Sequence, residues 1–121
     1  MHNLQKIYKD TGSVQEYTDA YFERLTAVLA TLDRDAIAKA VDAIENASQN
    51  CKALYTIANG GSAAAASHLV NDLVAGAYME GQPGFRSYCL TDNAESVTAL
   101  ANDAGFENIF SRQLMTNMVE G

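Results

Sequence analysis

The sequence has few cationic side chains. Of its 121 residues, 8 are lysine or arginine and 15 are aspartate or glutamate, which gives a formal net charge of −7 and an isoelectric point near 4.6. Because no run of lysine or arginine is present to neutralise a phosphate backbone, direct binding to nucleic acid is not expected. A small anionic ligand is compatible with this charge, since the dipole at a helix end acts locally.

Cysteine and long apolar segments are also scarce. The two cysteines, Cys51 and Cys89, form neither a CxxC pair nor a zinc-ligand spacing, and they are interpreted as buried thiols of a cytosolic protein. No apolar run is long enough to span a bilayer, and the first residues lack the apolar segment of a signal peptide. These absences predict a cytoplasmic protein with no membrane partner. The length and the 48% content of hydrophobic residues predict one domain with a modest core.

The most informative stretch, residues 53–73, has the pattern of a strand, a tight turn and a helix. Residues 53–58 are an apolar run, Gly60 and Gly61 can adopt backbone angles closed to other residues, and the alanines after Ser62 favour a helix. Unpaired N–H groups at the start of this helix would suit a phosphate, although an ordinary tight turn would contain the same glycines. Ser62 is placed to cap the helix or to offer its hydroxyl to that phosphate.

Two further pairs of polar residues are candidates for chemistry. His68 and Asp72 are four residues apart, so they share one face of the predicted helix. They could be a surface pair or a metal-binding or catalytic couple. Asn102 and Asp103 are likewise either a polar turn or a contact to a ligand.

Helices are expected before the central stretch. Residues 1–12 are polar and are expected to form an arm or a loose first turn. Ser13 begins a capping box, and the apolar residues that follow at three- and four-residue spacing predict a helix of about five turns. Asp33 is expected to cap a second helix that runs to Asn46. The pair would form a helical hairpin over residues 1–50, and its aromatic stripe could be either core or interface.

A second strand is predicted at residues 85–90, after a loop that contains the sole proline. A strand, a crossover helix and another strand imply a parallel pair with a right-handed connection. A helix capped by Asp92 or Asn93, a break at residues 102–105 and a further helix from Glu107 complete the expected order. Because two parallel strands are too few to bury both faces of a sheet, the sequence is interpreted as the N-terminal portion of a longer chain.

Three motifs occur in an order that is typical of one family. They are residues 59–73 (NGGSAAAASHLVNDL), residues 90–93 (LTDN) and residues 101–113 (ANDAGFENIFSRQ). Together they resemble the signature of sugar isomerase (SIS) domains, specifically of the phosphoheptose isomerase branch. The resemblance covers nearly the whole chain from Ser13 onwards.

The resemblance implies an α/β fold. A helical hairpin (residues 1–50) would precede the first βαβα units (residues 51–121) of a flavodoxin-like, doubly wound domain with a parallel sheet. Residues 1–121 would then be the N-terminal portion of a single, apparently truncated SIS domain.

The resemblance also implies an enzyme. Members of this branch are aldose–ketose isomerases that convert sedoheptulose 7-phosphate to D-glycero-D-manno-heptose 7-phosphate for the heptose of bacterial surface lipopolysaccharide. The reaction transfers a proton through an enediolate, so it needs a base near the carbon and an electrophile at the carbonyl oxygen. The family often uses a zinc ion as that electrophile, and a homotetramer is the expected assembly.

Eight residues match functional positions of the family. His68 and Asp72 match catalytic and zinc-binding positions, with the remaining zinc ligands expected beyond residue 121. The matched substrate-binding positions are Asn59, Gly60, Gly61, Ser62, Asn102 and Asp103. Asp72 stands where the family has a glutamate, and the arginine that usually follows a turn later is missing. Two alternatives therefore stay open. One is a different phosphosugar reaction on the same fold. The other is a non-catalytic SIS module that binds a sugar phosphate or a protein partner, as the related replication initiator-associating protein does.

Overall fold

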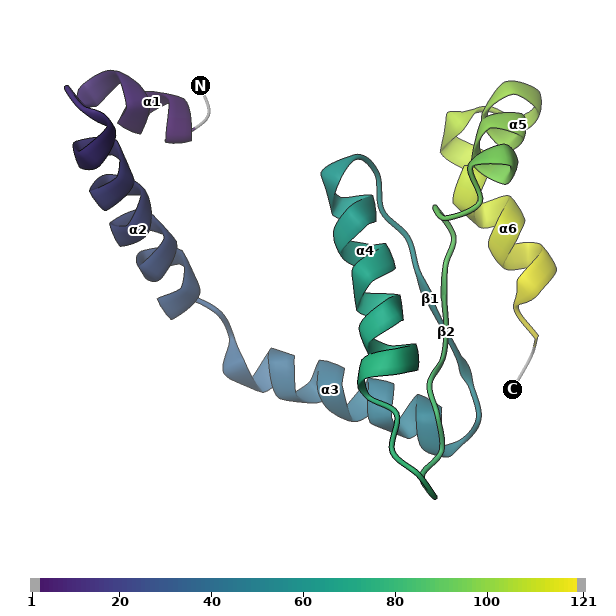
Figure 1. Cartoon of the computed structure of the whole chain (residues 1–121). Helices are drawn as coiled ribbons and strands as arrows, with labels where there is room; N and C mark the ends of the chain where they lie inside the picture. The colour runs from purple at the N-terminus through teal and green to yellow at the C-terminus, as the bar shows by residue number, and fades with distance from the viewer. Residues whose placement is uncertain (1–2, 120–121) are drawn as a thin grey trace. The chain divides into compact units, whose positions relative to one another are not determined.

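The computed structural model describes residues 3–119, which divide into two compact units (Figure 1). The first unit reaches to Lys39 and the second begins at Ala40, so the division falls within helix α3 (Arg34–Gln49). None of the helices in residues 3–119 combines the length and the apolar character needed to cross a bilayer.

The first unit contains helices α1 (Asn3–Asp10) and α2 (Val14–Ala30). The expectation of a loose arm at residues 1–12 is wrong for the described part, because residues 3–10 are helical. A helix of this length is marginal in isolation, and contact with α2 supplies the missing stabilisation. The rings of Tyr8 and Tyr17 meet edge to face with centroids 5.8 Å apart. This contact is tertiary, so the polar sequence of α1 did not reveal it.

Helix α2 begins with the predicted cap and exposes its apolar side chains. The Ser13 hydroxyl accepts a hydrogen bond from the Glu16 N–H at 3.2 Å, and the Glu16 carboxylate accepts one from the Gly12 N–H at 2.7 Å. No residue of α2 is buried. Its exposed large apolar residues are Val14, Tyr21, Phe22, Leu25, Val28 and Leu29. The stripe is therefore not core within the described residues, and a role as an interface stays a prediction.

Helix α3 has the predicted start and a later end. One carboxylate oxygen of Asp33 accepts hydrogen bonds from the N–H groups of Asp35 and Ala36 at 2.9 and 3.0 Å, which confirms the cap. The helix continues to Gln49, three residues past the predicted Asn46. The packing of α2 and α3 as a hairpin stays a prediction.

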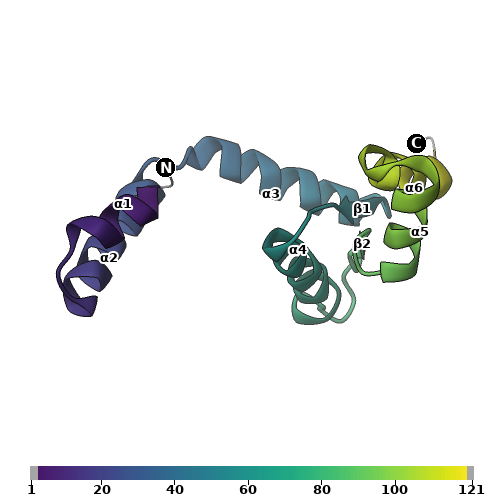
Figure 2. The same ribbon diagram turned by 90° about the horizontal axis from the view of Figure 1, so that it is seen from above.

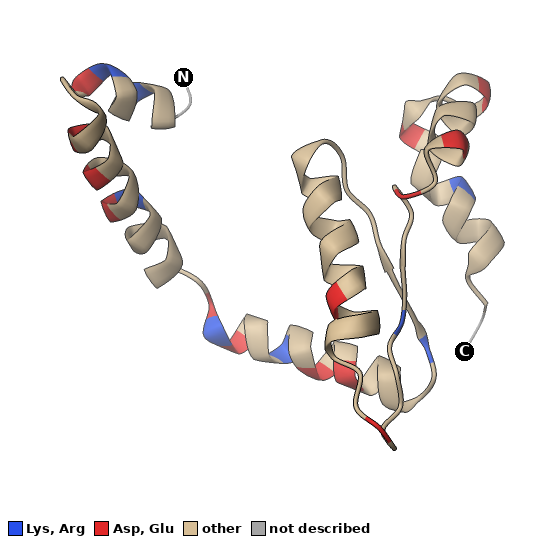
Figure 3. Cartoon of the chain, viewed as in Figure 1, with Lys and Arg blue, Asp and Glu red and all other residues tan. Residues whose placement is uncertain are grey.

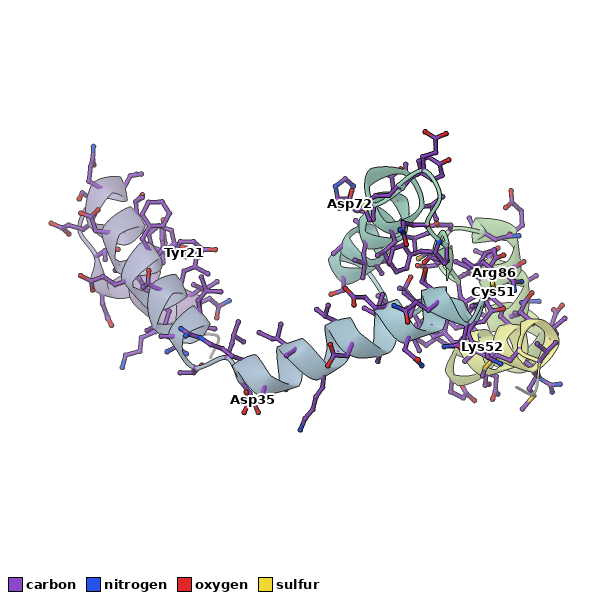
Figure 4. The ribbon with its side chains drawn as sticks, turned by 90° about the horizontal axis from the view of Figure 1, so that it is seen from below. Tyr21, Asp35, Cys51, Lys52, Asp72 and Arg86 are labelled. Atoms are coloured by element: carbon purple, nitrogen blue, oxygen red, sulfur yellow. The ribbon has the colours of Figure 1, made fainter. Side chains whose placement is uncertain are left out.

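The chain leaves α3 through a turn in which Cys51 has a positive φ of 53°. The prediction that both cysteines are buried is wrong for Cys51, which is exposed, and confirmed for Cys89. Cys51 lies in the turn outside the sheet, whereas Cys89 ends a strand. The Arg86 guanidinium donates to the Cys51 carbonyl at 2.9 Å and so ties this turn to the start of the second strand (Figure 4).

The second unit is built around a parallel pair of strands, as predicted. Strand β1 (Ala53–Thr56) pairs with β2 (Arg86–Cys89), and each is shorter than its predicted range. Helix α4 (Gly61–Asn71) lies on one side of the strands, and α5 (Ala94–Ala104) and α6 (Ile109–Asn117) lie on the other (Figures 1 and 2).

Side-chain contacts link both sides to the strands. The Thr56 hydroxyl donates to the carbonyl of Ala66 on α4 at 3.4 Å. On the other side, the Tyr55 hydroxyl donates to the Asn117 carbonyl of α6 at 2.8 Å, and the Tyr55 ring stacks on that of Tyr88 with centroids 5.6 Å apart. The sheet is thus contacted by helices on both faces.

The core of the second unit lies between the end of β2 and the start of α6. Its buried apolar residues are Cys89, Leu90 and Ile109, and Ile109 is only 1% exposed. The Gln113 side-chain amide donates to the carbonyls of Leu90 and Ile109, each at 3.1 Å, and so satisfies backbone groups beside this core. Hydrogen bonds and apolar packing therefore hold α6 against the end of β2.

The end of α5 differs from the prediction. Asn93 caps its start by accepting from the Ser96 N–H at 2.8 Å, which confirms one of the two candidate caps. The helix includes Asn102 and Asp103, and it ends at Ala104. Gly105 follows with a φ of 88°, a conformation that L side chains rarely adopt. The break therefore falls at Gly105 alone, and the 3-10 turn η2 (Phe106–Asn108) leads into α6.

Candidate functional site

The glycine turn follows β1 at the edge where the carboxyl ends of both parallel strands lie. Gly60 has φ 57° and ψ −134°, backbone angles that a residue with a Cβ cannot adopt without strain. A Cβ built on Gly60 or on Gly61 would meet no atom within 4 Å. Glycine is therefore required at residue 60 by the backbone, and both glycines border open space through which a ligand can approach.

The start of α4 has no side-chain cap. Gly60 is the capping residue, and its carbonyl accepts from the Ala63 N–H at 3.0 Å. Of the two roles predicted for Ser62, the capping role is wrong, because Ser62 lies inside the first turn of the helix and its side chain is exposed. The N–H groups at this end, together with the helix dipole, are an arrangement suited to an anion.

Charged side chains are absent from the first turns of α4, as residues 60–67 and Figure 3 show. An anion at this end would thus be held by backbone N–H groups and by hydroxyl or amide side chains. Asn59 and Ser62, both exposed, are the polar side chains within the turn.

His68 and Asp72 lie near the other end of α4 and face each other. The Nε2 atom of His68 is 3.7 Å from the Oδ1 atom of Asp72, and the two side chains are 75% and 60% exposed. Figure 4 shows Asp72 on this helix. An exposed pair of this kind contributes little to stability, because water screens the attraction. Both side chains are open to a ligand.

Asp72 also begins a π-helical turn, η1 (Asp72–Gly76), that continues α4. Its N–H bonds to the carbonyls of His68 and Leu69, and its carbonyl accepts from the Ala77 N–H at 2.7 Å. Turns of this kind are rare and occur frequently at functional sites. The sequence carried no signal for it, since helical spacing and a glycine near the end are equally compatible with an ordinary helix end.

The pair can supply part of a metal site. A tetrahedral zinc ion with nitrogen and oxygen ligands at about 2.0–2.1 Å separates its ligand atoms by about 3.4 Å. The 3.7 Å between His68 and Asp72 is near this value, so small side-chain rotations would let both atoms reach one ion. In residues 3–119 no group of three or more His, Cys, Asp or Glu side chains could hold a metal ion. From the described residues, this pair could therefore contribute at most two ligands to a metal ion.

Asn102 and Asp103 lie in the last turn of α5, where both are exposed. The Asn102 amide donates to the Asp103 carboxylate at 2.7 Å. Helix α5 packs on α6 and η2, whereas α4 packs on both strands. The eight predicted site residues thus form three groups in the described chain: the turn at residues 59–62, the His68–Asp72 pair and the Asn102–Asp103 pair.

A parallel strand–helix–strand unit with an open glycine turn before its crossover helix is typical of α/β domains that bind phosphorylated ligands. The more specific conclusion comes from comparison with known proteins. The chain belongs to the SIS domain family, which matches it over residues 16–119.

Curated relatives and solved structures support the same placement. The chain is 47% identical over 78 residues to the phosphoheptose isomerase of Geotalea daltonii, covering 64% of this chain and 40% of that protein. It is 42% identical over 73 residues to the phosphoheptose isomerase of Aneurinibacillus thermoaerophilus, covering 60% and 36%. The chain spans about two fifths of the length of these relatives.

Two solved structures resemble the fold. A phosphoheptose isomerase from Francisella tularensis matches with a TM-score of 0.78 and 27% identity, over 90% of this chain and 58% of that one. The phosphoheptose isomerase of Neisseria gonorrhoeae matches with a TM-score of 0.74 over 87% and 55%, and at 24% identity it supports the fold alone. The predicted α/β class and SIS family are confirmed. The division into residues 1–50 and 51–121 stays a prediction.

Proposed function

We propose that this chain is part of an aldose–ketose isomerase that converts sedoheptulose 7-phosphate to D-glycero-D-manno-heptose 7-phosphate for bacterial surface heptose. The observation that carries the proposal is the open, uncapped glycine turn at the start of α4, in a chain whose curated relatives are phosphoheptose isomerases. The complete protein would be cytoplasmic and homotetrameric. Residues 1–121 would be the N-terminal portion of its single SIS domain.

The first proposed step is binding of the phosphate group at the glycine turn. The N–H groups at the start of α4 would donate to the phosphate oxygens, and the Ser62 hydroxyl would add a further donor. Asn59, Asn102 and Asp103 would contact the sugar hydroxyls, because amide side chains can donate to and accept from hydroxyls and a carboxylate can accept from them. These contacts would hold the substrate in one orientation relative to the His68–Asp72 pair.

The second proposed step is proton transfer at the carbon next to the carbonyl. Asp72, whose side chain is 60% exposed, would take the proton from one carbon and return it to the neighbouring carbon, with the enediolate between. A zinc ion held by His68 and Asp72, with further ligands from outside residues 3–119, would supply Lewis-acid polarisation of the carbonyl oxygen. With or without the zinc ion, the His68 side chain would keep the Asp72 carboxylate oriented.

The test is hydrogen exchange. The complete protein, with zinc, is incubated with sedoheptulose 7-phosphate in deuterated water, and NMR follows deuterium incorporation beside the carbonyl. We expect Asp72→Asn to lower the exchange rate by about 100-fold or more, the usual range for loss of a general base. Glu80→Gln removes a carboxylate from an exposed loop position outside the site and is expected to leave the rate within twofold. Unchanged exchange in Asp72→Asn would remove this residue from the mechanism.

A second candidate is a non-catalytic SIS module that binds a sugar phosphate or a protein partner. The observation in its favour is Asp72 itself, whose carboxylate lies about 1.5 Å, one C–C bond, short of the glutamate typical of the family. A displacement of that size can cost about 100-fold in rate. Phosphosugar binding without any exchange in the unmodified protein would favour this candidate.

A further inference from the structure

The unusual segment of this chain is the π-helical turn η1 that begins at Asp72. We propose that η1 is a positioning element, which holds the Asp72 carboxylate against His68 so that the two side chains can bind one divalent cation. This inference rests on the proposed function, since it assigns a structural cause to the geometry of the same pair. The donor that defines the turn is the Ala77 N–H, which bonds to the Asp72 carbonyl at 2.7 Å.

The backbone of Asp72 is held on both sides. Its N–H bonds to the carbonyls of His68 and Leu69, which fixes it to the preceding turn of α4. Its carbonyl accepts from Ala77, five residues on, instead of from Gly76 as in an α-helix. Because both peptide groups of Asp72 are bonded, its Cα–Cβ direction is fixed, and the side chain has only its own rotamers through which to approach or leave His68.

The turn also keeps the space beside the Asp72 carboxylate open. With i to i+5 bonding, the residues that follow Asp72 on the same face are Gly76 and Ala77, which carry no side chain or a methyl group. A Cβ built on Gly76 would lie 3.9 Å from the Asp72 Cβ, in van der Waals contact with it, so glycine leaves this position beside Asp72 unoccupied. The small residues leave the Asp72 side chain 60% exposed.

The turn η1 also contacts the sheet. It packs against β2, so the chain must pass close to the sheet immediately after Asp72. One additional residue in the turn lets the backbone reach that contact without rotating Asp72 away from the His68 face. If one residue were removed, the turn could not both contact β2 and keep Asp72 on the His68 face, because each residue of an α-helix advances by about 100° around the axis.

The test measures cation binding, so it does not depend on turnover. Zinc is titrated into the complete protein while NMR follows the His68 ring protons, which are assigned by their absence from the spectrum of His68→Gln. Deletion of Ala75 shortens the turn by one residue. We expect the deletion to weaken zinc binding about as much as Asp72→Asn does, and we expect Asp72→Asn to have no further effect in the deletion background.

A second variant and its control cover the case in which the deletion prevents folding. Ala77→Pro removes the N–H that defines the turn, and the clash of proline with the preceding residue is reduced because Gly76 has no Cβ. Ala77→Gly keeps the N–H and should bind zinc within twofold of the reference. The ring signals of Tyr55 and Tyr88, which stack in the sheet, report whether each variant is folded.

Two results would overturn the inference. One is zinc affinity that stays at the reference value in folded variants without the turn. The other is a reference chain whose His68 signals do not respond to zinc. Isomerase activity does not enter either result, so the failure of the proposed reaction and the failure of this inference would be told apart.

Discussion

The two adjacent glycines of the turn before α4 should respond in opposite ways to the same substitution. Gly60→Ala places a Cβ on a residue with φ 57° and ψ −134°, whereas Gly61→Ala places it on the first residue of a helix. Neither Cβ would meet another atom within 4 Å, so no steric clash contributes in either case. The comparison therefore isolates the backbone conformation from packing.

The expected magnitudes follow from this difference. Gly60→Ala should lower the free energy of unfolding by about 1–3 kcal/mol, the cost of holding a residue with a Cβ in a sparsely populated region. Gly61→Ala should raise it by about 0.4–1 kcal/mol, because the substitution restricts the unfolded chain and alanine favours the helix. The two variants should thus differ in stability by more than 1 kcal/mol despite being neighbours.

The effects of the two substitutions on phosphate affinity should differ from their effects on stability. The Gly61 Cβ would occupy open space at the helix start, where the proposed phosphate approaches, so Gly61→Ala should weaken phosphate binding by about tenfold or more through lost charge-assisted hydrogen bonds. Urea unfolding and phosphate titration on the same samples measure both quantities. Equal destabilisation by the two substitutions would refute the backbone argument, and unchanged phosphate affinity in Gly61→Ala would refute the anion site.

Substitutions at two further residues test the packing and capping of the second unit. Ile109→Ala removes a side chain that is 1% exposed and should lower the free energy of unfolding by about 2–5 kcal/mol, measured by urea denaturation; a loss below 1 kcal/mol would mean that the site is not a packed core. Asn93→Ala removes the cap that accepts from Ser96 and should cost about 1 kcal/mol, whereas Asn93→Asp, which keeps the accepting oxygen, should restore most of it; equal stability of the two variants would show that the cap does not contribute.

Local signals predicted the framework of the second unit well. The short apolar runs became β1 and β2, and a strand–helix–strand order left a parallel pair as the expected topology. Side-chain caps at Ser13, Asp33 and Asn93 were visible because capping depends on residues two or three positions apart. These features are set by short-range interactions, which a single sequence displays directly.

The features that the sequence did not reveal depend on contacts across the fold or on backbone bonding. Helix α1 is stabilised by the packing of Tyr8 on Tyr17, which spacing within residues 1–12 could not indicate. The π-helical turn differs from an α-helix by the choice of acceptor for Ala77, and no residue type determines that choice. Asn102 and Asp103 stayed helical because the stop came from Gly105, whose positive φ ends the helix after them.

The candidate site was predictable to a similar extent. The glycine turn and the i, i+4 relation of His68 and Asp72 follow from sequence spacing, and the structure has both. The capping role of Ser62 was wrong because the helix begins two residues earlier than a cap at Ser62 requires. The catalytic and substrate-binding roles of all eight residues stay predictions, for which the experiments above are designed.

The parallel pairing of β1 and β2 has a consequence for the order of folding. Ala53 pairs with Arg86, and all of α4 and its following turn lie between them in the sequence. The two strands cannot meet until this connection closes, and its entropic cost falls when part of the connection is already compact. The helical hydrogen bonds of the alanine-rich α4 join residues close in sequence, so they form faster than strand pairing. Formation of α4 before the sheet would therefore shorten the flexible loop and speed the encounter of the strands.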